Sequence, residues 1–108
     1  MVLCGVFKMD KILNEIKAER ERQNKKWGEQ NHKPIEWIAI LTEEVGEASK
    51  EALDHYFENG LEKLKNEGGR EIMIDSIQED RLKRYRKEMI QVAAVAVQMI
   101  ECLDRNAT

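Results

Sequence analysis

Residues 79–105 read EDRLKRYRKEMIQVAAVAVQMIECLDR, and this stretch decides the fold class. Apolar residues recur in it every three or four positions, and neither glycine nor proline interrupts it, which is the pattern of an amphipathic helix. At 1.5 Å per residue such a helix is about 40 Å long. Its apolar run VAAVAV is wider than the stripe that one neighbouring helix covers. The stretch therefore predicts a long helix with more than one packing partner.

Two other segments have helical periodicity. The first extends from about residue 9 to residue 26, and the second extends from about residue 35 to residue 57, after Pro34, which suits a first helical turn. Strand patterns are nearly absent, and residues 58–78 show only a short helical pattern in GLEKLK. We therefore expect an all-α antiparallel helical bundle, completed by oligomerisation, in one domain spanning residues 1–108. Residues 1–8 are expected to form a peripheral N-terminal extension.

Composition narrows the functional classes. The 108 residues carry a formal net charge of -3, so no broad basic face is expected for a nucleic-acid polymer. The two cysteines, Cys4 and Cys102, form no CxxC pair and are interpreted as reduced thiols. The opening MVLCGVF is too short for a signal-peptide core, and no run reaches the ~18 apolar residues of a membrane span. We expect a cytoplasmic protein without a membrane partner.

The second predicted helix is rich in carboxylates. Residues 42–54, TEEVGEASKEALD, contain five of them. On a helical wheel Glu44, Glu47 and Glu51 border the apolar stripe that includes Trp37 and the alanines of this helix, whereas Glu43 points toward solvent. Unpaired charge beside an apolar stripe is costly. The pattern therefore predicts that the three bordering carboxylates have a partner.

The last helix has an inward carboxylate as well. Glu88 falls on the apolar stripe with Tyr85, Val92, Val95 and Leu103, and Gln91 lies one turn later. If the two helices pack antiparallel, Glu44 and Glu47 face Glu88 and Gln91. Oxygen ligands of this kind are those that Mg²⁺ prefers. The alternative is a solvated face whose carboxylates pair with neighbouring lysines and arginines, and the spacing alone leaves both readings open.

The same residues resemble those of a known family. EEVGE at residues 43–47, KWGEQ at 26–30 and EMIQVAAVAV at 88–97 together resemble the MazG-like all-α nucleoside triphosphate pyrophosphohydrolases, whose signature is EExxE followed by ExxD. The resemblance covers about residues 12–105. It implies a homodimer or homotetramer that binds Mg²⁺, with Mn²⁺ as a substitute. The implied reaction is the hydrolysis of (deoxy)nucleoside triphosphates to monophosphate and pyrophosphate.

The resemblance also assigns roles to individual residues. Glu44 and Glu47 match the first pair of metal ligands, and Glu88 matches the third ligand. On chemical grounds Glu44 and Glu47 are also the candidate catalytic carboxylates, and Glu47 could accept a proton from an attacking water if it does not ligate the metal. The fourth ligand position holds Gln91 where the family has aspartate. An amide oxygen can ligate Mg²⁺ but contributes no charge. Gln91 should therefore weaken metal binding, unless Glu51 supplies the missing charge. This departure leaves open an alternative: a catalytically weak or inactive helical module that binds nucleotide or metal.

Residues for the substrate are predicted from their positions near these ligands. Cations within a turn of the ligands could meet the phosphates: Lys50, Arg84 and Lys87. Three more lie on a segment that could close over them: Lys63, Lys65 and Arg70. The polar stretch before the second helix supplies stacking and edge-recognition groups for a base: Trp27, Gln30 and His32. Each cation also fits an ordinary surface charge. Trp37 is a further candidate for the base pocket, although a core position is the preferred reading for it.

Overall fold

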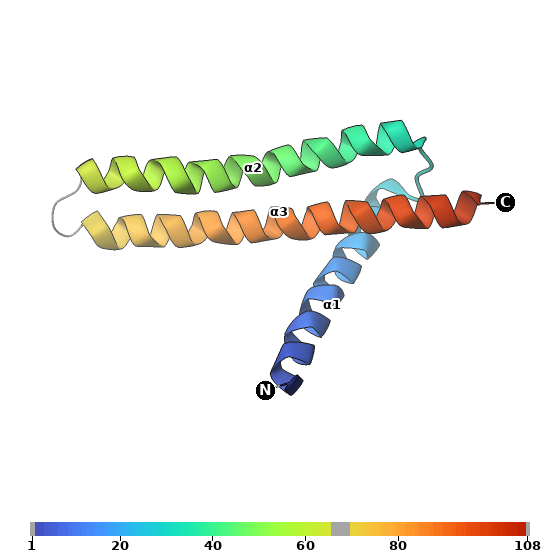
Figure 1. Ribbon diagram of the computed structural model, residues 1–108, viewed down its shortest axis with the longest axis horizontal. Helices are drawn as coiled ribbons and strands as arrows, with labels where there is room; N and C mark the ends of the chain where they lie inside the picture. Colours follow the sequence, from blue (N-terminus) through green and yellow to red (C-terminus); the bar gives the residue numbers. More distant parts are fainter. Residues whose placement is uncertain (1, 66–69, 108) are drawn as a thin grey trace.

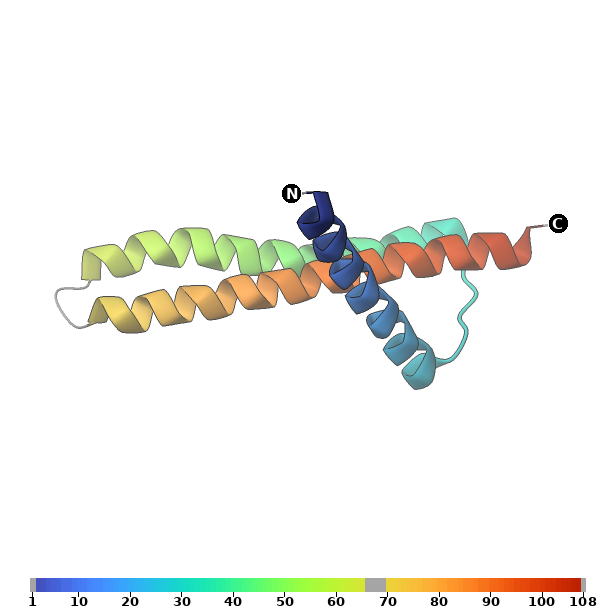
Figure 2. The ribbon, with the colours of Figure 1, turned by 90° about the horizontal axis from the view of Figure 1, so that it is seen from below.

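A computed structural model describes residues 2–65 and 70–107, with side chains for residues 8–57 and 79–107. It contains three helices, α1 (Val2–Trp27), α2 (Pro34–Lys65) and α3 (Arg70–Asn106), and no strand occurs within the described ranges. The predicted all-α class is confirmed. Helices α2 and α3 lie side by side and antiparallel, and α1 crosses α3 obliquely (Figures 1 and 2). Within these ranges α1 packs on α3 and not on α2.

The helices are longer than the sequence predicts. The predicted bounds near residues 9, 57 and 79 were wrong, because the helix ends lie at Val2, Lys65 and Arg70. Helix α2 continues past its predicted end near residue 57 and through Gly60. One glycine costs about 1 kcal/mol in a helix interior, which the packing of a long antiparallel neighbour can offset. No described helix is apolar over a stretch long enough to cross a membrane.

A short connection positions α1 relative to the other two helices. Gly28 has a φ of 73°, and its N–H donates to Asn24 O at 2.8 Å, which is a glycine C-cap of α1. Pro34 then begins α2, and the Glu36 carboxylate accepts a hydrogen bond of 2.8 Å from the Lys33 N–H. This is one half of a capping box. The helix end predicted near residue 26 and the helix start predicted near residue 35 are therefore confirmed.

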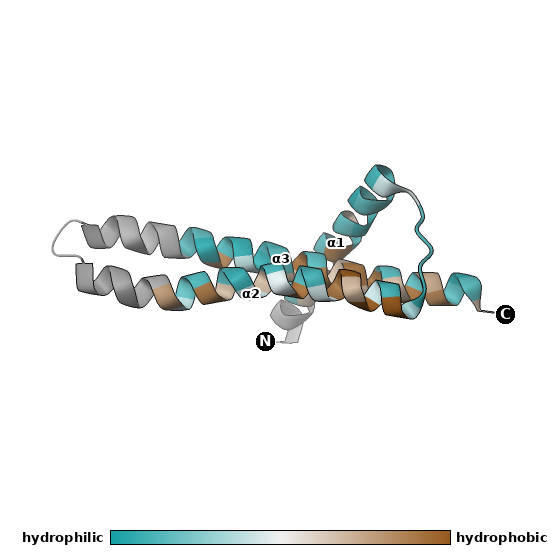
Figure 3. Ribbon diagram, turned by 90° about the horizontal axis from the view of Figure 1, so that it is seen from above, coloured by the Kyte–Doolittle hydropathy of each residue, from teal (hydrophilic) through white to brown (hydrophobic). Residues whose placement is uncertain are grey.

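The core is thin and consists mainly of small side chains. Its members among the described residues are Trp37, Ala48, Ala94, Val95 and Cys102. The core position predicted for Trp37 is confirmed. Three residues expected on the inner stripes are exposed instead: Ala52, Tyr85 and Leu103. The reason is that α1 covers only part of the hairpin of α2 and α3, and apolar colour gathers near the place where it crosses (Figure 3).

Polar contacts hold α1 on α3. The Arg20 side chain is only 8% exposed, and its Nε donates to Glu101 Oε1 at 2.6 Å. Its two Nη groups donate to Gln23 and Asn24. The polar stretch ERERQNKK at residues 19–26 predicts a solvated helix end for most of its side chains, but Arg20 is buried. The polar composition of a helical segment does not reveal which charged side chain is buried in an ion pair with another helix.

The whole chain is extended. Its radius of gyration is 18.1 Å, against about 13 Å for a compact domain of this length. Its accessible surface is 8506 Å², against about 6,200 Å² for a compact monomer of this mass. Beyond α1 the hairpin consists of two helices only (Figure 1). Large apolar side chains are exposed on this part: Leu53, Tyr56, Phe57, Leu82 and Tyr85.

The buried ion pair gives a stability prediction. Replacing Arg20 with alanine removes the guanidinium that joins α1 to α3, and we expect the free energy of unfolding to fall by about 2 kcal/mol. The matched control is Arg86→Ala, which breaks the exposed 2.6 Å pair with Glu15 between the same helices. Water screens that pair, so its loss should matter much less. Urea denaturation of both variants, followed by circular dichroism, tests this, and equal losses would contradict it.

Candidate functional site

Three carboxylates from two helices converge as the sequence predicts. Glu44 and Glu47 on α2 and Glu88 on α3 each place one carboxylate oxygen within 4.8 Å of those of the other two. Antiparallel packing of α2 and α3 brings these positions to the same level of the hairpin. The separation is close to that of opposite oxygen ligands on one small divalent cation, about 4 Å. Glu43 is exposed, as the helical wheel predicts.

Two oxygens of this carboxylate cluster lack partners. Glu44 Oε2 and Glu88 Oε2 are buried and have no hydrogen-bond partner among the described residues. A buried carboxylate oxygen without a donor carries a desolvation cost that a cation would offset. The donor set, carboxylate oxygen only, suits a hard cation such as Mg²⁺. The residues present therefore fit the predicted metal.

The cluster is also electrostatically unfavourable in the absence of a cation. Burial raises the pKa of the Glu44 carboxyl above its usual range, and nearby carboxylates raise it further: Glu47, Glu43 and Glu19. Burial likewise raises the pKa of Glu88, with further contributions from Glu47, Glu44 and Glu51. The folded protein therefore binds a proton at Glu44 and at Glu88 more tightly than an ordinary glutamate does. A divalent cation would reverse this preference.

A groove adjoins the carboxylate cluster because α1 packs on α3 and stands away from α2. It has a volume of about 270 Å³. Glu44 and Gln91 lie on its wall, together with Trp27 and Gln30. The structure therefore brings the predicted fourth ligand position and two of the three predicted base-recognition residues to one place. Trp27 is 61% exposed, so its ring face is accessible to a ligand.

The other predicted substrate residues lie elsewhere. His32 lines a different cavity, so it does not join Trp27 and Gln30. The Nε of Arg84 pairs with Glu51 at 3.2 Å. Arg84 was predicted to bind phosphate and Glu51 to compensate for Gln91, and in the structure each is engaged by the other. Lys50 is exposed and does not line the groove. Lys87 lies near Glu19, while the side chains of Lys63, Lys65 and Arg70 fall outside the described side chains.

Four groove residues were missed by the sequence analysis: Glu19, Arg22, Gln23 and Gln98. Arg22 is held by hydrogen bonds to both carboxylate oxygens of Glu19, from Nε at 2.8 Å and 3.1 Å and from Nη2 at 2.6 Å. The first three recur at positions i, i+3 and i+4 of α1, which places them on one helical face. That spacing was the available signal, and it was obscured by the uniform polarity of residues 19–26.

The groove and the cluster together have the chemical groups that a phosphorylated ligand needs. Arg22 offers a guanidinium, which can bind two phosphate oxygens at once. Trp27 offers an aromatic face, and Gln30, Gln91 and Gln98 add amides that both donate and accept hydrogen bonds. The carboxylate cluster lies at the Glu44 edge of this groove. A ligand with both a planar ring and a charged tail can therefore contact all of these groups.

The site so defined is a carboxylate cluster beside a polar groove in an all-α hairpin. No family model, curated protein or solved structure matches the chain significantly. The site is therefore interpreted from its own geometry and from the motif residues in EEVGE and EMIQVAAVAV.

The raised carboxyl pKa values predict a pH dependence of stability. The folded chain binds these protons more tightly than the unfolded chain does, and this stabilises the fold at low pH. The stabilisation is complete below the ordinary glutamate pKa of 4.5. It is lost as the pH rises through the raised pKa values of the folded chain. In chelator, Glu88→Gln should therefore be more stable than the parent at about pH 7.

This advantage should shrink as the pH falls toward 4.5, because Glu88 of the parent then becomes protonated and neutral. Urea denaturation of both proteins across this pH range measures it. The lowered pKa values of Glu15 and Glu19 act in the opposite sense at lower pH and are common to both proteins. An advantage that does not change with pH would contradict the prediction.

Proposed function

We propose that the protein is a Mg²⁺-dependent nucleoside triphosphate pyrophosphohydrolase that releases monophosphate and pyrophosphate from (deoxy)nucleoside triphosphates. The observation that carries this proposal is the convergence of three carboxylates, in which one buried oxygen of Glu44 and one of Glu88 have no hydrogen-bond partner in the described part of the chain. The reaction type comes from the resemblance of the motif residues to MazG-like enzymes. The adjoining groove supports it, because its aromatic, amide and guanidinium groups suit a nucleotide.

The ligands for the cation are Glu44, Glu47 and Glu88, with the amide oxygen of Gln91 as a neutral fourth donor. When bound, Mg²⁺ or its substitute Mn²⁺ neutralises phosphate charge and lowers the pKa of a bound water. Glu47 is the most exposed of the three carboxylates, which suits it best to accept a proton from an attacking water.

Other residues of this chain bind and orient the substrate. Arg22, held in place by Glu19, is the cation on the groove wall and would contact phosphate oxygens. Trp27 would stack on the base, and Gln30 would meet its polar edge. Positioning of this kind supplies much of the acceleration in phosphoryl transfer. Arg84 is instead assigned to the structural pair with Glu51.

A second function is favoured by one residue. Gln91 lies on the groove wall where the family signature has aspartate, and it leaves the cluster one negative charge short. A site that binds metal and nucleotide but turns over slowly or not at all is consistent with this difference. Metal binding is common to both functions, and release of pyrophosphate separates them.

Substitutions in the carboxylate cluster test the metal site. Glu44→Gln and Glu88→Gln each remove one charge from a buried oxygen cluster, and we expect each to weaken Mg²⁺ binding by about tenfold or more and to abolish pyrophosphate release. Glu43→Gln is the matched control, since it removes a charge from the adjacent exposed position. Calorimetric titration with Mg²⁺ and a pyrophosphate assay on a panel of nucleotides measure both effects.

Gln91→Asp tests the fourth position. The added carboxylate should tighten Mg²⁺ binding and, if the neutral amide limits turnover, raise the rate of pyrophosphate release. Aspartate is one methylene shorter than glutamine, so a partial gain is expected. Unchanged Mg²⁺ affinity in Glu44→Gln, Glu88→Gln and Gln91→Asp alike would overturn the metal site. Metal binding without pyrophosphate release in every protein would favour the binding module.

We further propose that two copies of the chain associate through the part of the hairpin that extends beyond α1. Two antiparallel helices cannot enclose their apolar side chains, whereas two such hairpins form a four-helix bundle. The surface of the chain exceeds that of a compact monomer by roughly 2,000 Å². A standard interface needs about 800 Å² from each partner. Leu53, Tyr56 and Leu82 would lie in this interface.

Light scattering at micromolar concentration tests the association. The parent should have at least twice the mass of one chain. Leu82→Glu places a charge in the expected interface and should give the monomer, because burying an unpaired carboxylate is costly. Ile35→Glu is the control, since Ile35 is equally apolar and 74% exposed but lies at the other end of α2. A monomeric parent would contradict the proposal.

A further inference from the structure

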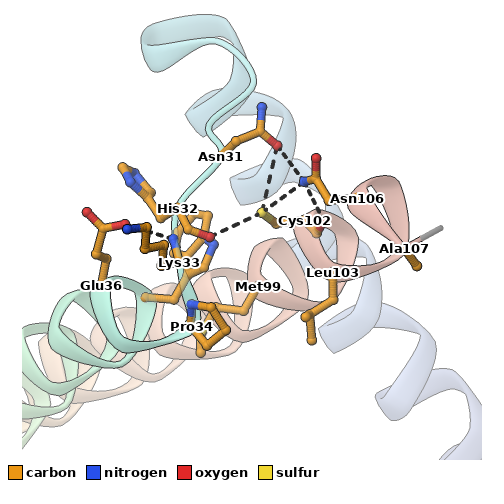
Figure 4. Close-up of a pocket in the computed structure, with 11 residues that line it drawn as sticks. Asn31, His32, Lys33, Pro34, Glu36, Met99, Cys102, Leu103, Asn106 and Ala107 are labelled. Atoms are coloured by element: carbon orange, nitrogen blue, oxygen red, sulfur yellow. Dashed lines mark hydrogen bonds between the residues drawn. The ribbon is translucent and has the colours of Figure 1, made fainter.

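A second cavity lies at the end of the molecule where α2 begins and α3 ends (Figure 4). Its volume is about 580 Å³, which is within the range of small-molecule sites. The linker and the two helix ends form its walls, with apolar groups from Pro34, Met99 and Leu103 and polar groups from Asn31, His32 and Cys102. None of these residues belongs to the carboxylate cluster. Lys33, Leu103 and Asn106 on its rim are exposed, so the cavity can be entered from solvent.

The thiol of Cys102 is the reactive group of this cavity. In Figure 4 its sulfur lies among Asn31 and His32 of the linker and Asn106 of α3. The thiol lies 3.8 Å from the His32 carbonyl oxygen, and Asn106 Nδ2 donates to the sulfur at 3.6 Å. The Trp37 indole N–H is the main cause of a lowered pKa of this thiol, followed by the His32 backbone, against an opposing effect of burial. These groups favour the thiolate, which is the nucleophilic form.

Trp37 points independently to a ligand. The residue is 3% exposed and lines the cavity, with the His32 ring packed edge-on at 4.8 Å. Its indole Nε1 is buried without a hydrogen-bond partner in the described part of the chain. The N–H is close enough to the Cys102 sulfur to lower the pKa of the thiol, but it does not meet the geometry of a hydrogen bond to it. A buried indole N–H normally has an acceptor, and a group attached to this sulfur would bring one.

We propose that Cys102 is a modification site that forms a mixed disulfide with a low-molecular-weight disulfide and holds the attached group in this cavity. The Cys102 thiol first loses its proton to solvent. The thiolate then attacks one sulfur of the small disulfide, a new S–S bond forms to Cys102, and the other sulfur leaves as a thiolate. The protein thiol is oxidised, and the departing half of the reagent is reduced.

The geometry gives the modification a consequence inside the protein. Trp37 lines this cavity and also the groove beside Glu44. A group attached to Cys102 therefore contacts a side chain that forms a wall of both spaces. Trp37 also reports on the modification, because an acceptor brought to its Nε1 and a disulfide beside its ring both change indole fluorescence.

The experiment uses the full chain with bis(2-hydroxyethyl) disulfide as the probe. In a Cys4→Ser protein, Cys102 is the remaining thiol, and intact mass spectrometry of the native protein should show the gain of one hydroxyethylthio group. Dithiothreitol should remove it. The matched control Cys102→Ser with Cys4 retained identifies any labelling at the other cysteine. Adding Trp27→Phe leaves Trp37 as the fluorescent tryptophan, and its emission should change on modification and recover on reduction.

The outcomes separate the proposal from simple unfolding. Labelling of native Cys4→Ser accompanied by a reversible change in Trp37 emission supports the site. Labelling that occurs only after denaturation in urea overturns it, since the cavity then does not admit the reagent. Labelling of the native protein without any change in Trp37 emission also overturns it, because the attached group then lies outside the cavity.

Discussion

The close packing of α2 against α3 through small side chains is the contact on which the rest of the structure depends. Ala48 of α2 and Val95 of α3 are almost completely buried, and short side chains let two helices approach closely. On α3 the residues Glu88, Val95 and Cys102 follow one another at seven-residue spacing, so they share one seam. The same contact therefore holds the carboxylate cluster and the wall of the second cavity. A larger residue at Ala48, one turn from Glu44, would move the helices apart and separate the carboxylates.

Helix α1 is held by charge more than by apolar contact, and this explains the polar groove. Arg20 is almost completely buried and uses its guanidinium for Glu101, Gln23 and Asn24. Because the anchor faces α3, the neighbouring face of α1 remains free and presents Arg22 toward α2. An apolar α1 would instead close against both helices of the hairpin and fill the groove.

Helical periodicity was sufficient to predict the fold class and the carboxylate cluster, because Glu44 and Glu88 are fixed by their angular positions on long helices. The helix ends were not predictable in this way, since Gly60 breaks an isolated helix more readily than one packed along a neighbour. The position of α1 also escaped prediction. It depends on ion pairs such as Arg20 with Glu101, which have no periodic signature. His32 was grouped with Trp27 by proximity in sequence, and the turn at Gly28 separates them.

The charge of the proposed metal site gives Gln91 a physical interpretation. Glu44, Glu47 and Glu88 together carry three negative charges when ionised, and one divalent cation leaves a single negative charge on the cluster. Glu19 adds negative potential at Glu44, although Arg22 partly offsets it through its hydrogen bonds to Glu19. A fourth carboxylate at position 91 would raise the pKa values of Glu44 and Glu88 still further and would require a second cation to balance it. The neutral amide of Gln91 therefore matches a site that holds one cation. Any second cation would have to enter already bound to the triphosphate of the nucleotide.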